Sequence, residues 1–450
     1  MTHRSSRGYN SQMKERLIQQ ALERRQRRVE MPQTPPEPVA AEVRAPADIP
    51  ARKYRFHLHP GYVQLRLIID GSAKLGIANP YFKVHDGIAG VTTCIGGKDY
   101  INYASYNYLG YSGDPRVSDA AKTAIDRCGT SVSASRLVSG ERGVHRELER
   151  TLAQTYGVDD AITFVSGHAT NVTVIGYLFG PKDLILHDTL VHNSVLQGIK
   201  LSGAHRLPFP HNDWAALEAI LTAQRHQFER VLIVVEGIFS MDGDYPDLPR
   251  FIELKRRHGA FLMVDEAHSF GVMGPTGLGI REHFGLAGSD VDIWMGTLSK
   301  TLASCGGYIA GETALIEHLK FLTPGFLYSV GMTPPTAASA LTALQLMRQE
   351  PERVAALQAC GILFRDEARA AGIDTGFSTG LAVVPALTGS SVKALKLSHA
   401  LLERGIHVQP ILYPAVPEKA ARLRFFMNCE HTQQQIHDTV RALKEESARV

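Results

Sequence analysis

The chain has 450 residues, 44% of them hydrophobic, which is enough for two or three domains with cores of their own. Its 48 Lys and Arg residues barely exceed its 45 Asp and Glu residues, and part of that excess lies in the first thirty residues. No basic face large enough for nucleic acid is therefore expected. No apolar run approaches the roughly 18 to 20 residues of a membrane span, and the N-terminus has no secretory apolar region.

The cysteines point to a reducing compartment. The five of them are odd in number, far apart and without CxxC spacing: Cys94, Cys128, Cys305, Cys360 and Cys429. This distribution indicates neither a disulfide framework nor a zinc site. We therefore expect the protein to work in the cytoplasm.

Residues 1–50 differ in pattern from the rest of the chain. The stretch 11–30, "SQMKERLIQQALERRQRRVE", puts apolar side chains on one stripe with basic ones around it, which predicts a basic amphipathic helix. The next stretch, 31–50, contains six prolines and favours an extended linker. The helix fits a solvated extension, a docking element for a partner protein, or an organelle presequence, which its three glutamates disfavour.

From about residue 100, short apolar runs alternate with helical patterns, which predicts an α/β fold with a mainly parallel sheet covered by helices on both faces. The runs are "AITFV" (161–165), "LIL" (184–186), "VLIVV" (231–235), "FLMV" (261–264), "DIWM" (292–295) and "YIA" (308–310). After an N-terminal segment at 51–105, we expect these runs to belong to a large domain at 106–335.

The C-terminal pattern is different. Past "MTPPTAASA" (332–340) a long helical pattern runs to about residue 370. Two strand-like runs follow, "LAVVPAL" (381–387) and "RLRFFMN" (422–428), with a helix between them and another after. This order predicts a smaller α+β domain at 336–450.

Polar residues follow two of the apolar runs, in "VEGIFSMDGDYPDL" (235–248) and "FLMVDEAHSFG" (261–271). In an open α/β sheet, ligands bind beyond the carboxyl ends of the strands. Asp265 comes directly after "FLMV", so its carboxylate should be partly buried and need a cationic partner, and His268 can face the same ligand. Taken alone, the stretch fits equally well an aspartate that caps the next segment and a surface histidine.

Lys300 lies at the end of another such strand, in "DIWMGTLSKTLASCGGYIAG" (292–311). A lysine in a partly dehydrated pocket has a lowered pKa, which a Schiff-base lysine needs, and Thr297 and Ser299 beside it can donate to an anion. Taken alone, Lys300 is more simply a salt-bridged loop residue. Together with Asp265 and His268, it favours pyridoxal 5′-phosphate (PLP): Asp265 can hold its cationic ring nitrogen, Lys300 can capture its aldehyde, and hydroxyls and amides can bind its phosphate.

The phosphate is expected at "TFVSGHATNVTVIGYL" (163–178), where a strand meets Ser166 and Gly167 and a helix begins. A plain helix cap would give the same pattern. His192, in "LVHNSVLQG", could stack its ring on the pyridine, although an isolated histidine is more often structural. No Walker A, GxGxxG or HExxH motif is present.

With these residues in place, the chain resembles the α-oxoamine synthases, fold-type I PLP enzymes that include 5-aminolevulinate synthase, 8-amino-7-oxononanoate synthase, 2-amino-3-ketobutyrate ligase and serine palmitoyltransferase. The similarity runs from "NYLGYSGDPRV" at 107 to the C-terminus, through "SASRLVSGERGVHRELE", "EGIFSMDGD", "VDEAHSFGVMGPTGLG", "GTLSK" and "YPAVPEKAARLRF". It implies a mainly parallel seven-stranded sheet between helices, a smaller α+β domain, and a homodimer with the site at the interface.

The resemblance also implies roles for single residues. Lys300 would form the Schiff base, Asp265 would pair with the pyridine nitrogen, and His268 would bond the phenolic oxygen. The remaining contacts implied are His192 on the ring with Ser240 nearby, Thr297, Ser166 and the amides of Gly167 and His168 at the phosphate, Ser329 and Thr333 reaching the phosphate of the partner subunit, and Asn107 and Arg424 at the substrates.

The reaction implied is condensation of an α-amino acid with an acyl thioester, carried by CoA or by a carrier protein, with loss of CO2 and the thiol, giving an α-aminoketone. Lys300 is the expected base at Cα. The substrate carboxylate needs a cation; Arg422 and Arg424 alternate on one strand and point the same way, and the resemblance favours Arg424. The alternatives are an aminotransferase or lyase of the same fold, and a non-catalytic subunit, which the retained Lys300 disfavours.

One position departs from part of the family. Oxononanoate and serine palmitoyl synthases carry an arginine where this chain has Leu412, in "ILYPAVP". The motif is closer to ketobutyrate ligase and levulinate synthase, which argues against a role in biotin synthesis. Members that release chains from polyketide-type assembly lines are also similar; on that hypothesis, residues 11–30 would dock the carrier protein. A primary-metabolic role, as a ketobutyrate ligase or serine palmitoyltransferase, is the alternative.

Overall fold

The computed structural model describes residues 49–74 and 79–450, which belong to two compact units, Met1–Leu75 and Gly76–Val450. The predicted amphipathic helix at 11–30 and the linker that follows it lie outside the described residues. In the first unit, two short 3-10 helices, Ala51–Lys53 and Phe56–Leu58, precede helix α2 (Pro60–Lys74). None of the helices in the described ranges is long and apolar enough to cross a membrane.

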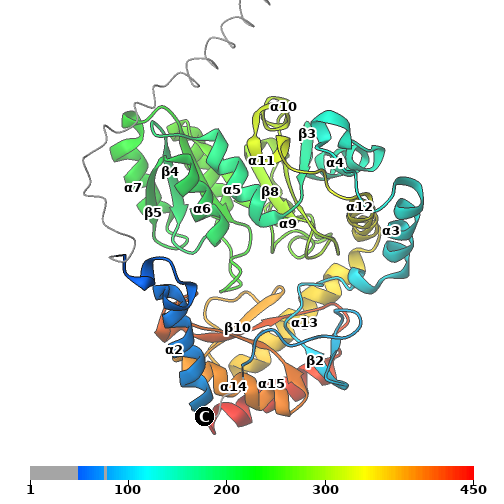
Figure 1. Cartoon of the computed structure of the whole chain (residues 1–450), viewed down its shortest axis with the longest axis vertical. Coiled ribbons are helices and arrows are strands. Elements are labelled where there is room, and N and C mark those ends of the chain that lie inside the picture. Colours follow the sequence, from blue (N-terminus) through cyan, green and yellow to red (C-terminus); the bar gives the residue numbers. More distant parts are fainter. Residues whose placement is uncertain (1–48, 75–78) are drawn as a thin grey trace, which may run out of the picture. The chain divides into compact units, whose positions relative to one another are not determined.

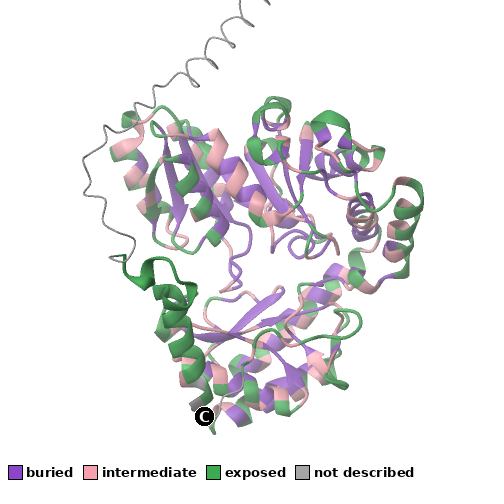
Figure 2. Ribbon diagram, in the orientation of Figure 1, coloured by how far each residue is buried: buried purple, intermediate pink, exposed green. Residues whose placement is uncertain are grey.

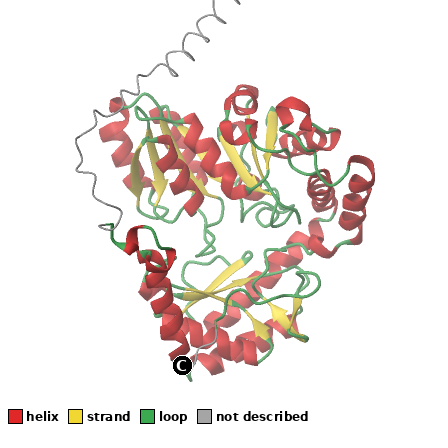
Figure 3. Ribbon diagram, viewed as in Figure 1, coloured by secondary structure: helices red, strands yellow, loops and turns green. Residues whose placement is uncertain are grey.

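A seven-stranded sheet forms the centre of the second unit (Figure 3). Its order is β3-β9-β8-β7-β6-β4-β5, and all neighbours are parallel except β9, which runs antiparallel to both β3 and β8. The strands are β3 (Asp160–Phe164), β4 (Leu184–Asp188), β5 (His205–Phe209), β6 (Val231–Glu236), β7 (Phe261–Asp265), β8 (Ile293–Thr297) and β9 (Gly307–Gly311). The predicted α/β class and seven-stranded sheet are confirmed.

Both faces of this sheet are buried except at its edge strand β5, and this is why the other strands read as continuous apolar runs (Figure 2). Alternate residues of β6 belong to two separate hydrophobic clusters, Ile233 and Val235 to one and Leu232 and Val234 to the other. Helices α4 (Gly143–Tyr156), α7 (Trp214–Gln224), α8 (Leu248–His258) and α12 (Pro334–Gln349) contribute to the first cluster. Helices α5 (Gly167–Leu178), α6 (Asn193–Ser202), α10 (Thr313–Leu322) and α11 (Pro324–Leu327) contribute to the second, and α5 and α6 lie side by side (Figure 1).

Two small sheets lie apart from the central one, β10-β13-β12 from the C-terminal part and β1-β2-β11, in which the C-terminal strand β11 pairs with a hairpin at residues 92–102. The expected strands near 381–387 and 422–428 are β10 (Val383–Leu387) and β13 (Arg422–Phe426), which pair antiparallel. The predicted long helical pattern is two helices, because it breaks at Glu350 before Pro351. The other elements are α3 (Pro115–Cys128), α9 (Gly279–His283), α13 (Pro351–Ala370), α14 (Ser391–Glu403), α15 (Gln433–Ser447), β1 (Thr92–Ile95), β2 (Lys98–Asn102), β11 (Ile406–His407) and β12 (Gln409–Ile411).

The loop 237–247, between β6 and α8, joins the central sheet to the C-terminal part. His211, just after β5, lies 3.0 Å from the carboxylate of Asp188 at the end of β4 and 2.8 Å from that of Asp244 in the loop. Burial opposes the charged imidazole, but hydrogen bonds to the two carboxylates outweigh it and raise the pKa of His211 to about 10. On the other side of the loop, Gly243 (φ 72°) packs so closely on the Val383 carbonyl of β10 that a Cβ would clash. The loop is therefore held from both sides.

Candidate active site

A cavity of about 290 Å³ lies at the carboxyl ends of the central strands, where an α/β sheet is expected to bind its ligand. Segments after β3, β4, β6, β7 and β8 line it together with β13 of the C-terminal part. Of the residues predicted from the sequence, it brings together Gly167, His168, His192, Ser240, Asp265, His268, Thr297, Lys300 and Arg424.

Lys300 projects from a tight loop because β9 reverses direction after β8. The amide of Leu298 donates to the carbonyl of Gly306 over 2.9 Å, and the amide of Ala303 to that of Lys300 over 3.0 Å, so the loop closes on itself. The lysine amine lies 5.7 Å from the centre of the Tyr106 ring. Loss of hydration lowers the pKa of Lys300 to about 8, although the carboxylate of Asp265 acts in the opposite direction. The amine is thus a nucleophile close to neutral pH.

Asp265 ends β7 and is 4% exposed. One of its oxygens accepts from the amide of Ala267 over 3.0 Å, and the other from the side-chain amide of Asn171 over 2.8 Å. Neither partner is a cation, so the carboxylate retains its charge for a group in the cavity. A protonated ring nitrogen is such a group.

Two histidines contact the cavity from different sides. The Nδ1 of His268 lies 2.7 Å from the hydroxyl of Tyr108, and burial, with Lys300 and Arg424 nearby, holds the pKa of His268 well below its usual range. His192 begins α6, and its amide donates to Glu236 over 2.5 Å. Burial, together with the charge of Asp265 on the neighbouring strand, raises the pKa of Glu236 well above its usual range. Both imidazoles are therefore neutral, and so is the carboxyl behind His192.

The N-terminus of α5 forms one end of the cavity. Ser166 caps this helix, its hydroxyl accepting from the amide of Ala169 over 3.3 Å, which leaves the amides of Gly167 and His168 for an anion. A Cβ on Gly167 would lie 2.9 Å from the hydroxyl oxygen of Thr297, so the glycine keeps open the path by which an anion reaches these amides. The Thr297 hydroxyl donates to the carbonyl of Gly306 over 2.9 Å and would have to turn to donate to a phosphate.

The two arginines of β13 differ in their partners. Arg422 is bound to Asp242 over 2.6 Å and to the carbonyl of Met241 over 2.9 Å, so it is structural. Arg424 lines the cavity, donates to the carbonyl of Ser240 over 3.2 Å, and forms no ion pair with a carboxylate of the described chain. Arg424 is therefore the guanidinium available to a ligand.

Four predicted residues do not line this cavity: Ser166, which caps α5, and Ser329, Thr333 and Asn107. Ser329 and Thr333 do not line this cavity; the Ser329 hydroxyl bonds the carbonyl of Val330, and Thr333 bonds Thr336. Asn107 lines a second cavity of about 400 Å³, which meets the first at Lys300 and Tyr106. The side-chain amide of Asn107 donates to the carbonyl of Ala89 over 3.0 Å, so it shapes the wall of that second cavity.

Sequence reasoning missed four residues of this site: Asn171, Ser194, Glu236 and Tyr106, which all line the first cavity. Glu236 had a detectable signal, since it ends an apolar strand as Asp265 does. The sequence signal for Asn171 was weaker: it is a polar residue inside the apolar helix α5, and the structure shows it buried.

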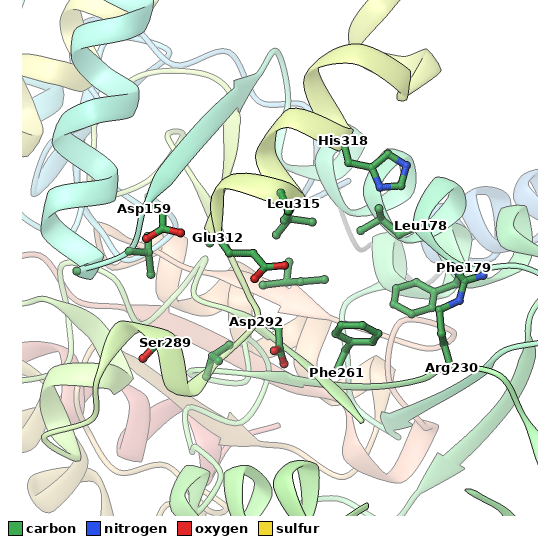
Figure 4. Close-up of a pocket in the computed structure, with 16 residues that line it drawn as sticks. Asp159, Leu178, Phe179, Arg230, Phe261, Ser289, Asp292, Glu312, Leu315 and His318 are labelled. Atoms are coloured by element: carbon green, nitrogen blue, oxygen red, sulfur yellow. The ribbon is translucent and has the colours of Figure 1, made fainter. Parts of the chain in front are cut away.

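A separate cavity of about 360 Å³ opens at the other ends of the strands, near Phe261 at the start of β7 and Gly311 at the end of β9 (Figure 4). Figure 4 shows Asp159, Asp292 and Glu312 around it. Its lining contains no lysine, so it offers nothing to bind an aldehyde.

The comparisons with known proteins agree with this geometry. The sequence profile of the family "Aminotransferase class I and II" matches residues 98–443. The 8-amino-7-oxononanoate synthase of Fervidobacterium nodosum is 40% identical over 350 residues, covering 77% of this chain and 88% of the relative. That of Symbiobacterium thermophilum is 39% identical over 348 residues, with the same coverage.

Among solved structures, the serine palmitoyltransferase of Sphingomonas wittichii superposes with a TM-score of 0.83 at 28% identity, over 87% of this chain and 98% of that one. A variant of the S. paucimobilis enzyme with a bound PLP–myriocin compound gives 0.82 at 28% identity, over 87% and 97%. The chain therefore belongs to the aminotransferase class I and II family, within the α-oxoamine synthases, and is a PLP-dependent acyltransferase. The predicted family, fold and cofactor are confirmed.

The residues present fit PLP. Lys300 offers a reactive amine, Asp265 a carboxylate without a cationic partner, and the start of α5 two free amides beside a glycine whose Cβ would crowd Thr297. We assign these three places to the aldehyde, the ring nitrogen and the phosphate.

The pH dependence of PLP capture tests whether the amine of Lys300 loses its proton near neutral pH. Only the unprotonated amine attacks the aldehyde, so the rate at which the PLP-free protein binds the cofactor should rise about tenfold per pH unit at first and level off above pH 8, the pKa of Lys300. Stopped-flow absorbance follows the capture, and Lys300→Ala supplies the blank. A midpoint near the ordinary lysine pKa of 10.5 would contradict the assignment.

The phosphate end is tested by Gly167→Ala. The added methyl lies against Thr297, so PLP should bind on the order of tenfold or more weakly. Gly143→Ala is the matched control, because Gly143 also begins a helix and its Cβ would have no atom within 4 Å. Equal dissociation constants for the two variants, measured by fluorescence titration, would count against the placement.

Proposed function

We propose that this protein joins an α-amino acid to an acyl thioester, with loss of CO2 and the free thiol, and so forms an α-aminoketone. One observation carries the proposal: a single cavity holds the amine of Lys300, the carboxylate of Asp265 and the guanidinium of Arg424. The first two suit PLP, and the third suits the carboxylate of an amino acid, which a planar guanidinium binds through two hydrogen bonds.

Each of these residues then has a task. PLP, when bound, supplies an aldehyde for the substrate amine and a cationic ring that draws electrons from Cα. Asp265 keeps the proton on the ring nitrogen, and Arg424 orients the substrate carboxylate. Lys300, released as a free amine, takes the proton from Cα. A bond would form between Cα and the acyl carbon while the carbon–sulfur bond breaks, and the sulfur would leave as a thiolate that takes a proton from water. The carboxylate would then leave as CO2, and the protonated Lys300 would return its proton to Cα.

The chain's relatives are named for 8-amino-7-oxononanoate synthesis, but we propose a different acyl donor for this protein. Leu412, where that group carries an arginine, packs as an apolar residue against the core. We place the reaction in secondary metabolism, at the release of a polyketide-type chain. The rival reactions of this fold, transamination and lyase chemistry, need no thioester.

We further propose a cytoplasmic homodimer. The five cysteines are all free thiols, as a reducing compartment favours. Ser329 and Thr333 lie outside the cavity of their own chain, which leaves them free to reach the phosphate in the partner subunit.

Mass spectrometry of products tests the reaction. The holoenzyme is given mixed amino acids and mixed acyl thioesters, and the expected products have the mass of the two joined, less CO2 and the thiol. A carboxyl-labelled amino acid should lose its label as CO2 only when a thioester is present. Keto acids formed without a thioester would instead establish the rival reactions.

Arg424→Lys tests the substrate carboxylate site. Lysine keeps the charge but cannot form the paired hydrogen bonds, so KM for the amino acid should rise about tenfold to a hundredfold. Arg404→Lys, in an ion pair with Glu445 and Glu446 away from the cavity, is the matched control and should leave KM unchanged. An unchanged KM in Arg424→Lys would remove this role.

For residues 11–30 we propose docking of a carrier protein. Deleting residues 1–50 should lower the rate with a carrier-bound acyl group on the order of tenfold, because docking raises the local concentration of the donor. The rate with the same acyl group on a small thiol should be unchanged, and serves as the control. Equal rates for both chains with the carrier-bound donor would refute the docking role.

A further inference from the structure

Asn171 and Ser194 connect Asp265 to His192 by a continuous run of hydrogen bonds. The Asn171 side chain donates to Asp265 over 2.8 Å and to the hydroxyl of Ser194 over 2.9 Å. That hydroxyl lies 2.7 Å from the Nδ1 of His192. Asn171 is 1% exposed and Ser194 is fully buried, so water does not compete for these bonds.

The direction of every bond in this run is determined. A carboxylate only accepts, so Asn171 must present its NH2 group, not its oxygen, to Asp265. The second hydrogen of that NH2 group then goes to Ser194. The backbone amide of Ser194, which only donates, also points at the Nδ1 of His192 over 3.3 Å. Nδ1 therefore carries a lone pair, and the Ser194 hydroxyl gives its hydrogen to the same atom.

We propose that Asn171 is a positioning residue which, through Ser194, holds His192 as the neutral imidazole with its proton on Nε2, while the same amide orients Asp265. One side chain would thus orient both His192, which stacks on the ring, and Asp265, which pairs with the ring nitrogen. This inference rests on the proposed stacking role of His192. A neutral imidazole does not repel the cationic ring that Asp265 holds, whereas an imidazolium would.

The surroundings of His192 act in the same direction. Loss of hydration lowers the pKa of His192; the charge of Asp265 raises it, and those of Lys300, His168 and Arg424 lower it again. The carboxyl of Glu236 binds the His192 backbone amide and is itself held neutral by burial. Of these groups, Asp265 is the one that favours imidazolium, and Asn171 already occupies one of its oxygens.

Nitrogen NMR of the full-length protein, labelled with ¹⁵N-histidine, reads the proton position directly, and His192→Asn assigns the signal. In the wild-type protein, with and without PLP, the proton should lie on Nε2. In Ser194→Ala the pKa of His192 should rise by roughly one unit, because the hydroxyl that donates to the neutral ring is lost. Ser202→Ala, on the same helix with its hydroxyl bound to the carbonyl of Ile199, should leave this pKa unchanged.

The affinity for PLP gives a second readout. Ser194→Ala should bind PLP on the order of fivefold more weakly than wild type at about pH 6, because its imidazole is protonated more readily, and as tightly as wild type at about pH 8. Asn171→Ala should bind more weakly at both pH values, because Asp265 also loses a donor. A wild-type proton on Nδ1, or an unchanged His192 in Ser194→Ala, would overturn the proposal. Neither result depends on finding the condensation activity.

Discussion

The buried carboxylate of Asp265 is the group on which the charges of this site depend. It is 4% exposed, and both of its oxygens receive hydrogen bonds from neutral amides. Its charge helps to keep the neighbouring Glu236 protonated and opposes the loss of the proton from Lys300. Because burying a charge is costly unless it is balanced, the cavity favours a ligand that brings a cation to this place. The protonated ring of PLP would supply that cation on the proposed assignment.

The reversal of one strand explains how a lysine comes to lie opposite that carboxylate. If β9 were parallel to β8, the connection between them would need a crossover of a dozen residues or more. Since β9 is antiparallel, nine residues, 298–306, suffice, and Lys300 stays at the carboxyl ends of the strands. A short loop with its own backbone hydrogen bonds holds the amine in a poorly hydrated place.

The sequence predicted the parts of this site that follow directly from a strand. Asp265, His268 and Lys300 come just after apolar runs, and the position of a strand end is readable from the run itself. Partners brought together by folding were not readable: Asn171 meets Asp265 across 94 positions and Tyr108 meets His268 across 160. The strand β5, "HRLPF", was missed because it lies at the sheet edge and is largely polar or exposed, with a proline inside it. β11, with two residues, is too short to form a pattern.

On the proposed assignments, different parts of the chain hold the cofactor and the substrate. Every predicted PLP contact that lines the cavity comes from the loops of the central sheet, whereas Arg424 comes from β13 of the C-terminal part. The loop 237–247 holds Arg424 over the cavity. His211 links this loop to the central sheet through Asp244, and Arg422 binds the loop through Asp242. Because Arg422 forms the ion pair with Asp242, Arg424, two residues further along β13, remains to bind the substrate in the proposed reaction. The alternation of two arginines on one strand thus separates assembly from recognition, and a shift of the loop, which also carries Ser240, would move the guanidinium that faces the cavity.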